Sequence, residues 1–233
     1  MNLAFPPHPS ATLSIAGSEQ RFPVRRIFCV GRNYADHARE MGAIDQAEGR
    51  EPPFFFTKPA DAVVGSEGEV SVRYPPQTAN LHHEVEMVVA LGAGGANVAV
   101  DAANSLIFGY AVGLDLTRRD MQARAKEKSH PWDMSKGFDQ SAVSGAITPV
   151  AVSGHPAAGR IWLNVNGQLR QEGDLSAMMW KVAEIVANLS TLVRLEAGDL
   201  IYTGTPAGVG PLARGDVLEA GVDGVGTLRA RIV

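Results

Sequence analysis

The chain has 233 residues, of which 45% are hydrophobic, and its formal net charge at pH 7 is −4. This length and composition are typical of one large globular domain with a substantial core. The net negative charge argues against a nucleic-acid-binding protein, and the lack of any run of about 18 apolar residues argues against a membrane-spanning helix.

Cysteine content and the N-terminal residues predict a cytoplasmic protein. Cys29 is the only cysteine, so no disulfide can form within the chain, as is usual in a reducing compartment. We expect its side chain to be a small buried apolar group. The first residues, MNLAFPPHPS, have no basic segment followed by a long apolar stretch, so no secretory signal is predicted.

Alternating apolar residues and frequent turn residues predict many short strands. ATLSIAG and RFPV indicate an edge hairpin, which we take as a small appendage over residues 1–24 in front of a main domain over residues 25–233. Two further hairpins are predicted by the turn pairs Asn166-Gly167 and Asp223-Gly224. Other strands are predicted in RIFCVG, FFFTKP, AVVGSEGEVSVRYPP, LHHEVEMVVAL (81–91), SLIFGYAVGLDL and GDLIYTG.

Helical spacing predicts three helices. NYADHAREMG suits a short helix that Asn33 caps and Gly42 ends, and the polar loop AIDQAEGREPP follows it. Thr117 and Asp120 have the spacing of a capping box, so a second helix is expected from there to about residue 128. The third lies in LSAMMWKVAEIVANLSTLV, with Met178, Ile185 and Leu189 among its apolar positions.

Strands outnumber helices in this pattern, and many are joined by short turns. That arrangement argues against a regular alternating βαβ sheet. We therefore predict an α+β fold, rich in β structure, whose sheet is rolled or forms a sandwich.

Two carboxylates interrupt the hydrophobic stretch 81–91. Glu84 and Glu86 are two residues apart, so on a strand they share one face with His82 and Val88. Buried side by side they would repel each other unless a cation lay between them, and Mg²⁺ or Ca²⁺ prefers such oxygen ligands. The alternative is a half-exposed edge strand whose glutamates face water, and the spacing alone favours that alternative.

A third carboxylate ends another apolar strand. Asp115 follows GYAVGL, and strand ends are common positions for site residues. Asp115 could instead cap the following helix, but Thr117 already suits that position. Together with Glu84 and Glu86, this aspartate raises the case for a metal site.

A histidine and a glutamate lie three residues apart in the first predicted helix. His37 and Glu40 therefore share a face. A carboxylate beside an imidazole orients the ring and raises its basicity, which makes the pair a candidate general base for water. The alternative, favoured by spacing alone, is a solvated pair worth a few tenths of a kcal/mol.

The segment TRRDMQARAKEKSHPWDMSKGFD carries side chains that could bind a carboxylate or a developing oxyanion. These candidates are Arg118, Arg119, Gln122 and Lys136. An ordinary charged and exposed helix accounts well for Arg124, Lys126, Glu127 and Lys128. It accounts less well for Lys136, which follows a proline and lies among apolar residues. Further along, YTGTPAGVG offers backbone N–H groups and hydroxyls as an anion cradle.

Taken together, these segments resemble the fumarylacetoacetate hydrolase family. The resemblance extends from Arg26 to the C-terminus and is nearest to the short bacterial fumarylpyruvate hydrolases of gentisate breakdown, and next to the acylpyruvate hydrolases. The segments that carry it, in the family's order, are CVGRNYADHAREMG, PPFFFTKPADAVV, LHHEVEMVVALG, GYAVGLDLTRRDMQ, SKGFDQSAVSG and DLIYTGTPAGVGP.

The resemblance implies the family's mixed β-sandwich roll, assembled as a homodimer. It implies a Mg²⁺ or Mn²⁺ ion, with Ca²⁺ as a substitute in a crystal, held by Glu84, Glu86 and Asp115. It also implies that His37 and Glu40 form a water-activating dyad on a mobile helix. Residues implied in substrate and oxyanion contact are Lys136 and Gln122, with Arg119 and Thr205 nearby and Arg32, Tyr34 and Lys58 as further candidates for lining the pocket.

One position departs from the family's pattern. Longer members carry a further acidic ligand seven residues before the dyad histidine, where this chain has Val30. Water would then complete the coordination of the ion, as Mg²⁺ readily permits.

The implied reaction is hydrolysis of a carbon–carbon bond in a 1,3-diketo acid, with fumarylpyruvate giving fumarate and pyruvate in aromatic catabolism. His37 would take a proton from water, the hydroxide would attack the distal ketone, and the metal would stabilise the departing pyruvate enolate. Other acyl groups stay open, as does oxaloacetate decarboxylation or tautomerisation, because the family's metal sites look alike. A non-catalytic acid-binding homologue is disfavoured by the intact set of ligands, dyad and lysine.

Overall fold

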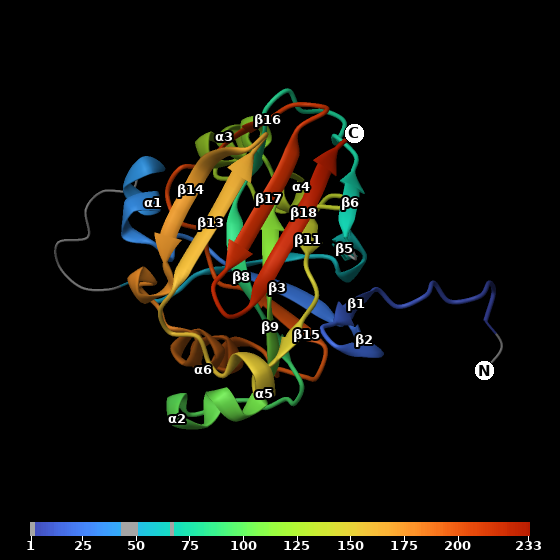
Figure 1. The fold of residues 1–233 in the computed structure, drawn as a ribbon, viewed down its shortest axis with the longest axis vertical. Coiled ribbons are helices and arrows are strands. Elements are labelled where there is room, and N and C mark those ends of the chain that lie inside the picture. The colour runs from blue at the N-terminus through green and yellow to red at the C-terminus, as the bar shows by residue number, and fades with distance from the viewer. Residues whose placement is uncertain (1–2, 43–50, 66–67) are drawn as a thin grey trace.

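The structure is a computed structural model that describes residues 3–42, 51–65 and 68–233. Most of the polar loop predicted after the first helix lies outside the described residues. Within them, strands dominate, and the sheets pack face to face with helices gathered at two ends (Figure 1). The predicted α+β fold, rich in β structure, is confirmed.

The central sheet has eight strands in the order β4-β3-β15-β8-β9-β11-β5, with β12 paired to β9. The antiparallel pair β8 and β9 lies in its middle. The strands are β3 (Arg26–Val30), β4 (Phe55–Lys58), β5 (Val63–Gly65), β8 (Val85–Leu91), β9 (Ile107–Asp115), β11 (Ala142–Ser144), β12 (Thr148–Pro149) and β15 (Asp199–Tyr202).

A five-stranded sheet in the order β14-β13-β17-β18-β6 covers one face of the central sheet (Figure 1). Both predicted hairpins are confirmed within it, because β13 pairs antiparallel with β14 and β17 with β18. At the first turn, Asn166 and Gly167 have φ values of 53° and 75°, as a two-residue hairpin turn requires. The strands are β6 (Glu69–Val72), β13 (Arg160–Val165), β14 (Gln168–Asp174), β17 (Val217–Val222) and β18 (Gly226–Ile232).

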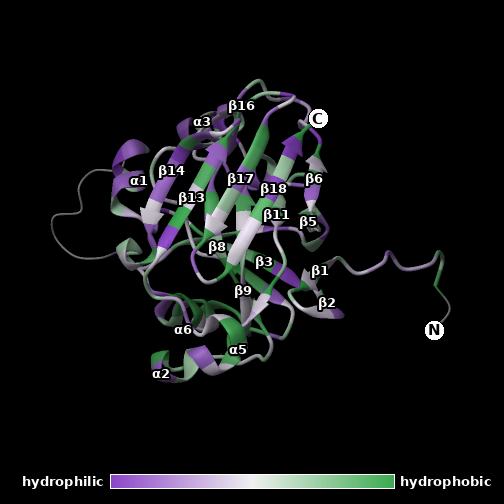
Figure 2. Cartoon of the chain, viewed as in Figure 1, coloured by the Kyte–Doolittle hydropathy of each residue, from purple (hydrophilic) through white to green (hydrophobic). Residues whose placement is uncertain are grey.

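The hydrophobic core forms on both faces of β8, because successive side chains of a strand point to opposite sides. One face contributes Val85, Met87, Val89 and Leu91 to the larger cluster, which packs against the five-stranded sheet. The other contributes Val88 and Ala90 to a smaller cluster that contains Cys29. Figure 2 shows the hydrophobic colour concentrated on interior strands and α6, and the hydrophilic colour on α1 and α3.

The predicted N-terminal hairpin is confirmed. Strands β1 (Thr12–Ile15) and β2 (Ser18–Pro23) pair antiparallel, and Leu13 and Phe22 pack in the smaller hydrophobic cluster. Residues 3–11, before β1, extend away from the body of the molecule (Figure 1). The division into an appendage and a main domain after residue 24 stays a prediction.

The single strand predicted over residues 81–91 is wrong. The segment forms two strands, β7 (Leu81–His83) and β8, with Glu84 between them. Strand β7 belongs to a separate three-stranded sheet with β10 (Thr117–Arg118) and β16 (Gly210–Leu212). The chain therefore passes from one sheet to another at Glu84.

Helices lie at the two ends of the sandwich (Figure 1). Those near the end of β9 are α1 (Ala35–Glu40), α3 (Arg119–Glu127) and α4 (Asp133–Lys136). Those at the opposite end are α2 (Val100–Ala103), α5 (Val150–Ser153) and α6 (Val182–Leu192), and short 3₁₀ turns are η1 (Ala60–Ala62), η2 (Asn104–Leu106) and η3 (Leu175–Ala177). Among the described residues, no helix is long and apolar enough to cross a membrane.

Both predicted helix caps are wrong. Asn33 is not the N-cap of α1, which begins after Tyr34; its amide instead donates to the carbonyls of Trp180 at 2.9 Å and Thr203 at 2.8 Å. Thr117 lies in β10 rather than at the start of α3, which ends at Glu127 as expected. Tertiary contacts outweigh local capping at both positions. The third predicted helix begins at residue 182, later than expected.

Candidate active site

Three predicted metal ligands meet where β9 ends. The register of β8 and β9 pairs Val85 with Leu114, and the next N–H along β9, that of Asp115, donates to the carbonyl of Glu84 at 2.9 Å. Carboxylate oxygens of Glu84, Glu86 and Asp115 lie within 4.8 Å of one another. These side chains are buried, and β8 is a central strand. The alternative of a half-exposed edge strand is therefore wrong.

Three cations surround these carboxylates. Lys136 Nζ donates to Glu84 Oε2 at 2.8 Å and to Asp115 Oδ2 at 2.7 Å. Lys58 Nζ lies 2.7 Å from Asp115 Oδ1. Arg119 donates through Nη2 to Glu84 Oε1 at 2.5 Å. Two of the three carboxylates thus have a positive partner.

Glu86 is the exception, since no described lysine or arginine pairs with it. Its Oε2 accepts a hydrogen bond from the backbone N–H of Gly204 at 2.6 Å. Burial raises the pKa of Glu86 well above its ordinary value, and the charges of Asp115 and Glu84 raise it further. Burial also acts to raise the pKa of Glu84, but the charges of Lys136 and Arg119 outweigh it and lower the pKa.

This donor set fits a hard divalent cation. Three carboxylates offer oxygen atoms within reach of one ion, which is the chemistry that Mg²⁺ and Mn²⁺ accept. Asp115 Oδ1 receives no hydrogen bond, because its ion pair with Lys58 lacks hydrogen-bond geometry. A divalent ion would supply the positive charge that Glu86 lacks. Val30 lines the cavity next to these carboxylates, and its side chain offers no atom that could bind the ion.

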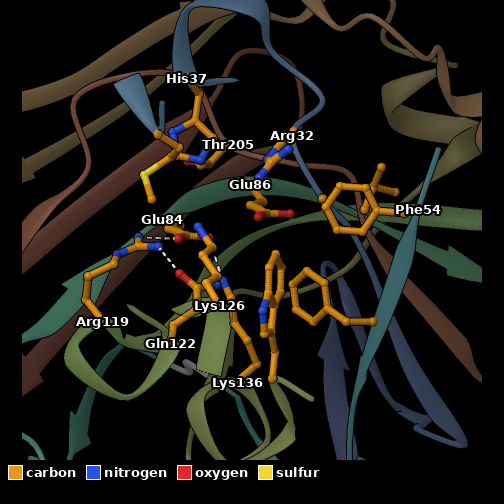
Figure 3. Close-up of a pocket in the computed structure, with 15 residues that line it drawn as sticks. Arg32, His37, Phe54, Glu84, Glu86, Arg119, Gln122, Lys126, Lys136 and Thr205 are labelled. Carbon is orange, nitrogen blue, oxygen red and sulfur yellow. Dashed lines mark hydrogen bonds and ion pairs between the residues drawn. The ribbon is translucent and has the colours of Figure 1, made fainter. Parts of the chain in front are cut away.

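A cavity opens above the carboxylates and leaves about 30 Å³ free for water (Figure 3). Tyr34 and Lys58 do not line it: Tyr34 is buried in the larger hydrophobic cluster, and Lys58 pairs with Asp115. The predicted residues that do line the cavity are Arg32, His37, Glu84, Glu86, Arg119, Gln122, Lys136 and Thr205.

His37 enters this cavity from α1. Its Nδ1 lies 3.2 Å from Glu40 Oε2, and the backbone N–H of Gly208 donates to both Glu40 oxygens at 3.2 Å. If Nδ1 carries the proton that Glu40 accepts, the lone pair is on Nε2. Burial lowers the pKa of His37 below 6.5, although the charges of Glu84 and Glu40 oppose that effect. The imidazole is therefore neutral near pH 7 and able to accept a proton.

Two polar side chains are oriented to donate into the cavity. Arg119 Nη1 donates to Gln122 Oε1 at 2.7 Å, which leaves the amide hydrogens of Gln122 for a ligand. Gln171 Nε2 donates to Thr205 Oγ1 at 2.8 Å, which leaves the hydroxyl hydrogen of Thr205 free in the same way. Both arrangements suit the stabilisation of negative charge.

Several residues of the site were missed in the sequence. The aromatic side chains Phe54, Phe56 and Trp132 line the cavity, as does Lys126, which had been assigned to an exposed helix face. Helical spacing could have revealed Lys126, because it lies four residues after Gln122 and so on the same face of α3. The aromatic residues gave no comparable signal, because strand β4 and the Trp132 loop are brought together only by folding.

Gln171 is a further residue that was missed, and it ties β14 to the site. It is 1% exposed. Its Oε1 lies 2.8 Å from His83 Nδ1 and accepts from the backbone N–H of Val85 at 3.0 Å, and its Nε2 donates to the carbonyl of Pro206 at 2.9 Å. One amide thus joins β14, β7, β8 and the loop that carries Thr205.

Replacing Gln171 by methionine is expected to lower the free energy of unfolding by about 1–3 kcal/mol, because buried donors and acceptors lose their partner. Urea denaturation of both proteins measures the change. Gln168→Met, on an exposed position of the same strand, is the matched control and should change stability by less than about 0.5 kcal/mol. Equal effects of the two substitutions would contradict the assigned role of Gln171.

Comparison with known proteins shows that the sequence of this chain is similar to that of one family of enzymes. The sequence model described as fumarylacetoacetate (FAA) hydrolase C-terminal matches residues 26–233. A fumarylpyruvate hydrolase of Ralstonia sp is 45% identical over 178 residues, covering 75% of this chain and 90% of the relative. The mitochondrial oxaloacetate tautomerase FAHD1 of Mus musculus is 44% identical over 208 residues, covering 89% of this chain and 91% of the relative.

A solved structure has the same fold as this chain over its whole length. The crystal structure of fumarylpyruvate hydrolase from Pseudomonas aeruginosa in complex with Mn²⁺ and pyruvate superposes with a TM-score of 0.95 at 49% identity. The match covers 100% of this chain and 99% of that one.

Proposed function

The chain belongs to the fumarylacetoacetate hydrolase family, and from that premise we propose that it hydrolyses fumarylpyruvate to fumarate and pyruvate with the help of a divalent metal ion. The resemblance that its motifs carry is thereby confirmed, as is the β-rich fold of that family. The proposal that fumarylpyruvate is the substrate is supported by the Ralstonia relative and by the Pseudomonas aeruginosa structure with Mn²⁺ and pyruvate.

One observation carries the proposal: a neutral, oriented imidazole faces the carboxylate cluster across one cavity. His37 and both glutamates of the cluster line that cavity, and Glu40 holds the ring from behind. Hydrolysis needs a base for water beside a metal ion that stabilises an enolate; the base and two of the carboxylates that would hold such an ion line one small cavity.

Glu84, Glu86 and Asp115 would hold Mg²⁺ or Mn²⁺, with Ca²⁺ as a substitute. When bound, the ion supplies Lewis-acid stabilisation of negative charge at the 2-oxo acid end of the substrate. His37 takes a proton from water at Nε2 while its Nδ1 keeps the hydrogen that it donates to Glu40. The activated water attacks the carbonyl carbon of the acyl group, the bond from that carbon to the methylene carbon breaks, and its electron pair leaves with the pyruvate enolate. The proton that His37 took from water then returns to the enolate to give pyruvate, and the acyl group leaves as fumarate.

Gln122, Thr205 and Lys136 would stabilise the negative charge that forms during this attack. The first two present hydrogens to the cavity, as their partners dictate. Lys136 stays protonated: burial acts to lower its pKa, but the charges of Asp115 and Glu84 outweigh burial and raise it. A protonated lysine at this position is a fixed positive charge beside the reacting atoms.

A panel of acylpyruvates tests the proposal directly. Protein loaded with Mg²⁺ or Mn²⁺ is mixed with fumarylpyruvate and with acylpyruvates of other acyl groups, and loss of the diketone absorbance is followed. Fumarate and pyruvate should appear in equal amounts, and only with metal present. Failure to cleave any acylpyruvate in the metal-loaded state would refute the proposal.

The second candidate function is tautomerisation or decarboxylation of oxaloacetate, without attack of water. It is favoured by the oxaloacetate tautomerase FAHD1, which is 44% identical. Product analysis separates the two: oxaloacetate yields its keto or enol form, or pyruvate and carbon dioxide, whereas fumarylpyruvate must take up water. Comparing kcat/KM for the two substrates decides which reaction dominates.

The pH dependence of turnover should report His37. We expect kcat/KM for fumarylpyruvate to fall on the acid side with a midpoint below 6.5, because burial lowers the pKa of this imidazole and only its neutral form accepts a proton. In Glu40→Gln the midpoint should move further down, since the Glu40 carboxylate raises that pKa. Profiles measured at saturating metal test this, and a midpoint above 6.5 in the wild type would contradict it.

Assembly and location belong to the same proposal. We infer a homodimer from the family resemblance and a cytoplasmic location from the single buried cysteine. The molar mass in solution, measured by light scattering, tests the first inference.

A further inference from the structure

Lys126 faces the cavity from α3. Arg119, Gln122 and Lys126 are spaced by three and four residues, so they share one side of the helix, and all three line the cavity (Figure 3). The first two have partners there, because Arg119 binds Glu84 and Gln122. Lys126, unlike these two residues, has no hydrogen-bond or ion-pair partner of this kind among the described residues.

No described carboxylate forms an ion pair with Lys126. Its Nζ lies over the ring of Trp132, 5.3 Å from the centroid. Burial lowers the pKa of Lys126, and the positive charges of Arg32 and Arg119 lower it further, against a smaller opposing effect of the Glu84 charge. A half-buried ammonium group beside other cations is costly unless an anion joins it.

Arg32 provides a second cation at the same wall of the cavity. It lies next to Phe54 in Figure 3, with its guanidinium 5.9 Å from that ring's centroid, and it too forms no ion pair with a described carboxylate. Its φ of 56° is unusual for a residue other than glycine. The backbone thus holds an unfavourable conformation at the position that presents this charge.

The balance of charges around the cavity indicates that the ligand carries a second negative charge. At its base, the carboxylates of Glu84, Glu86 and Asp115 are matched in number by Lys58, Lys136 and Arg119. A divalent ion there adds positive charge, which the carboxylate of a 2-oxo acid only partly offsets. Lys126 and Arg32 add two more positive charges beside the aromatic wall, so a ligand with a second carboxylate would balance the site better than one with a neutral tail.

The aromatic wall suits the chain that would join these two carboxylates. Phe54 and Phe56 both contact Trp132 edge to face, with ring centroids 5.8 and 6.0 Å apart. Rings in this arrangement offer flat apolar surface to a short carbon chain. Each of two of these rings carries a charged group, with Lys136 over the Phe56 ring and Lys126 over the Trp132 ring.

We propose that Lys126, assisted by Arg32, binds the distal carboxylate of the substrate and thereby selects 1,3-diketo acids whose acyl group ends in a carboxylate. This inference rests on the proposed function for the orientation of the ligand, with its 2-oxo acid end at the carboxylate cluster. Lys126 acts on specificity and takes no part in the bond-breaking steps.

Binding of two inert acids tests the subsite without turnover. Calorimetry on Mn²⁺-loaded protein compares 2-oxoadipate, which has a distal carboxylate, with 2-oxohexanoate, which has the same chain length and none. The wild type should bind the dicarboxylate at least about tenfold more tightly, as expected for a charge-assisted hydrogen bond. In Lys126→Met most of that preference should disappear, while the aliphatic stem stays against Trp132. Lys126→Arg should keep it.

Lys128→Met is the matched control, because Lys128 lies two residues further along and is exposed; it should retain the wild-type preference. A wild type without preference, or an unchanged preference in Lys126→Met, would overturn the subsite. Turnover gives an independent result: Lys126→Met should lower the ratio of kcat/KM for fumarylpyruvate over acetylpyruvate at least about tenfold.

The two proposals fail in different ways. If the wild type binds 2-oxoadipate through Lys126 but cleaves neither acylpyruvate, the hydrolase function is wrong and the subsite stands. If it cleaves both, and Lys126→Met changes both values of kcat/KM by the same factor, the function stands and the subsite is wrong.

Discussion

Replacing His37 by alanine is expected to lower kcat for fumarylpyruvate by about 10²–10⁴-fold, the usual contribution of a positioned general base. The side chain is 8% exposed and supplies the described imidazole that lines the cavity. Its removal takes away the proton acceptor for water but none of the three carboxylates. The affinity for Mn²⁺ should therefore stay within a few-fold of the wild type. Steady-state kinetics and calorimetric titration with Mn²⁺ measure the two quantities.

His8→Ala is the control for this variant, since His8 is exposed in the N-terminal segment before β1. It should change neither turnover nor metal affinity. Unchanged turnover in His37→Ala would end the proposed mechanism. Loss of metal binding together with turnover would instead assign His37 a part in the metal site.

Replacing Glu86 by glutamine is expected to lower the affinity for Mn²⁺ by at least about 100-fold and to remove metal-dependent turnover. Glutamine keeps the size of the side chain and an oxygen that can accept the Gly204 N–H, but it lacks the negative charge. Loss of a direct ligand should cost more than the 10–100-fold that loss of a hydrogen-bonded neighbour of a ligand costs. Calorimetry with Mn²⁺ measures the affinity.

The metal-free variant should be no less stable than the metal-free wild type. Burial and two neighbouring carboxylates raise the folded-state pKa of Glu86, so its ionised form destabilises the native state at neutral pH. A neutral amide removes that cost. Addition of Mn²⁺ should raise the Tm of the wild type, because binding stabilises the native state, and should leave the Tm of Glu86→Gln almost unchanged.

Asp115→Asn offers a comparison of opposite sign. Asp115 pairs with Lys58 and Lys136, so its neutral replacement leaves two buried cations with less compensation. This variant should lose both metal binding and stability in the metal-free state. If Glu86→Gln also proved strongly destabilised without metal, the account of its uncompensated charge would be wrong.

Much of the carboxylate cluster could be predicted from the sequence. Spacing along one strand suggested that Glu84 and Glu86 face the same way, and the position of Asp115 at a strand end suggested a third member. Neither pattern showed that the strands are neighbours. The register of β8 against β9 brings Asp115 opposite Glu84, and pairing between distant segments is decided by the packing of the whole sheet.

Local rules failed where side chains have distant partners. Asn33 has a good helix-capping residue type, but its amide binds segments 147 and 170 residues away in the chain. Gln171 appeared to be an ordinary residue of a hairpin, and only folding gave it four partners on other elements. Buried polar groups take the partners that satisfy them, and the sequence does not show which ones lie near.

The sequence by itself determined the secondary-structure content and the family of this protein: a β-rich chain, two hairpins with defined turns, buried strands with alternating faces, and motifs that mark the family. These follow from local propensity and periodicity, which act between residues close in the chain. The tertiary structure alone decided that the strand at Glu84 divides between two sheets, that Glu86 lacks a cation, and that Lys126 faces the cavity. Those outcomes depend on burial and charge among elements far apart in sequence, and such interactions exist only once the sheets have packed.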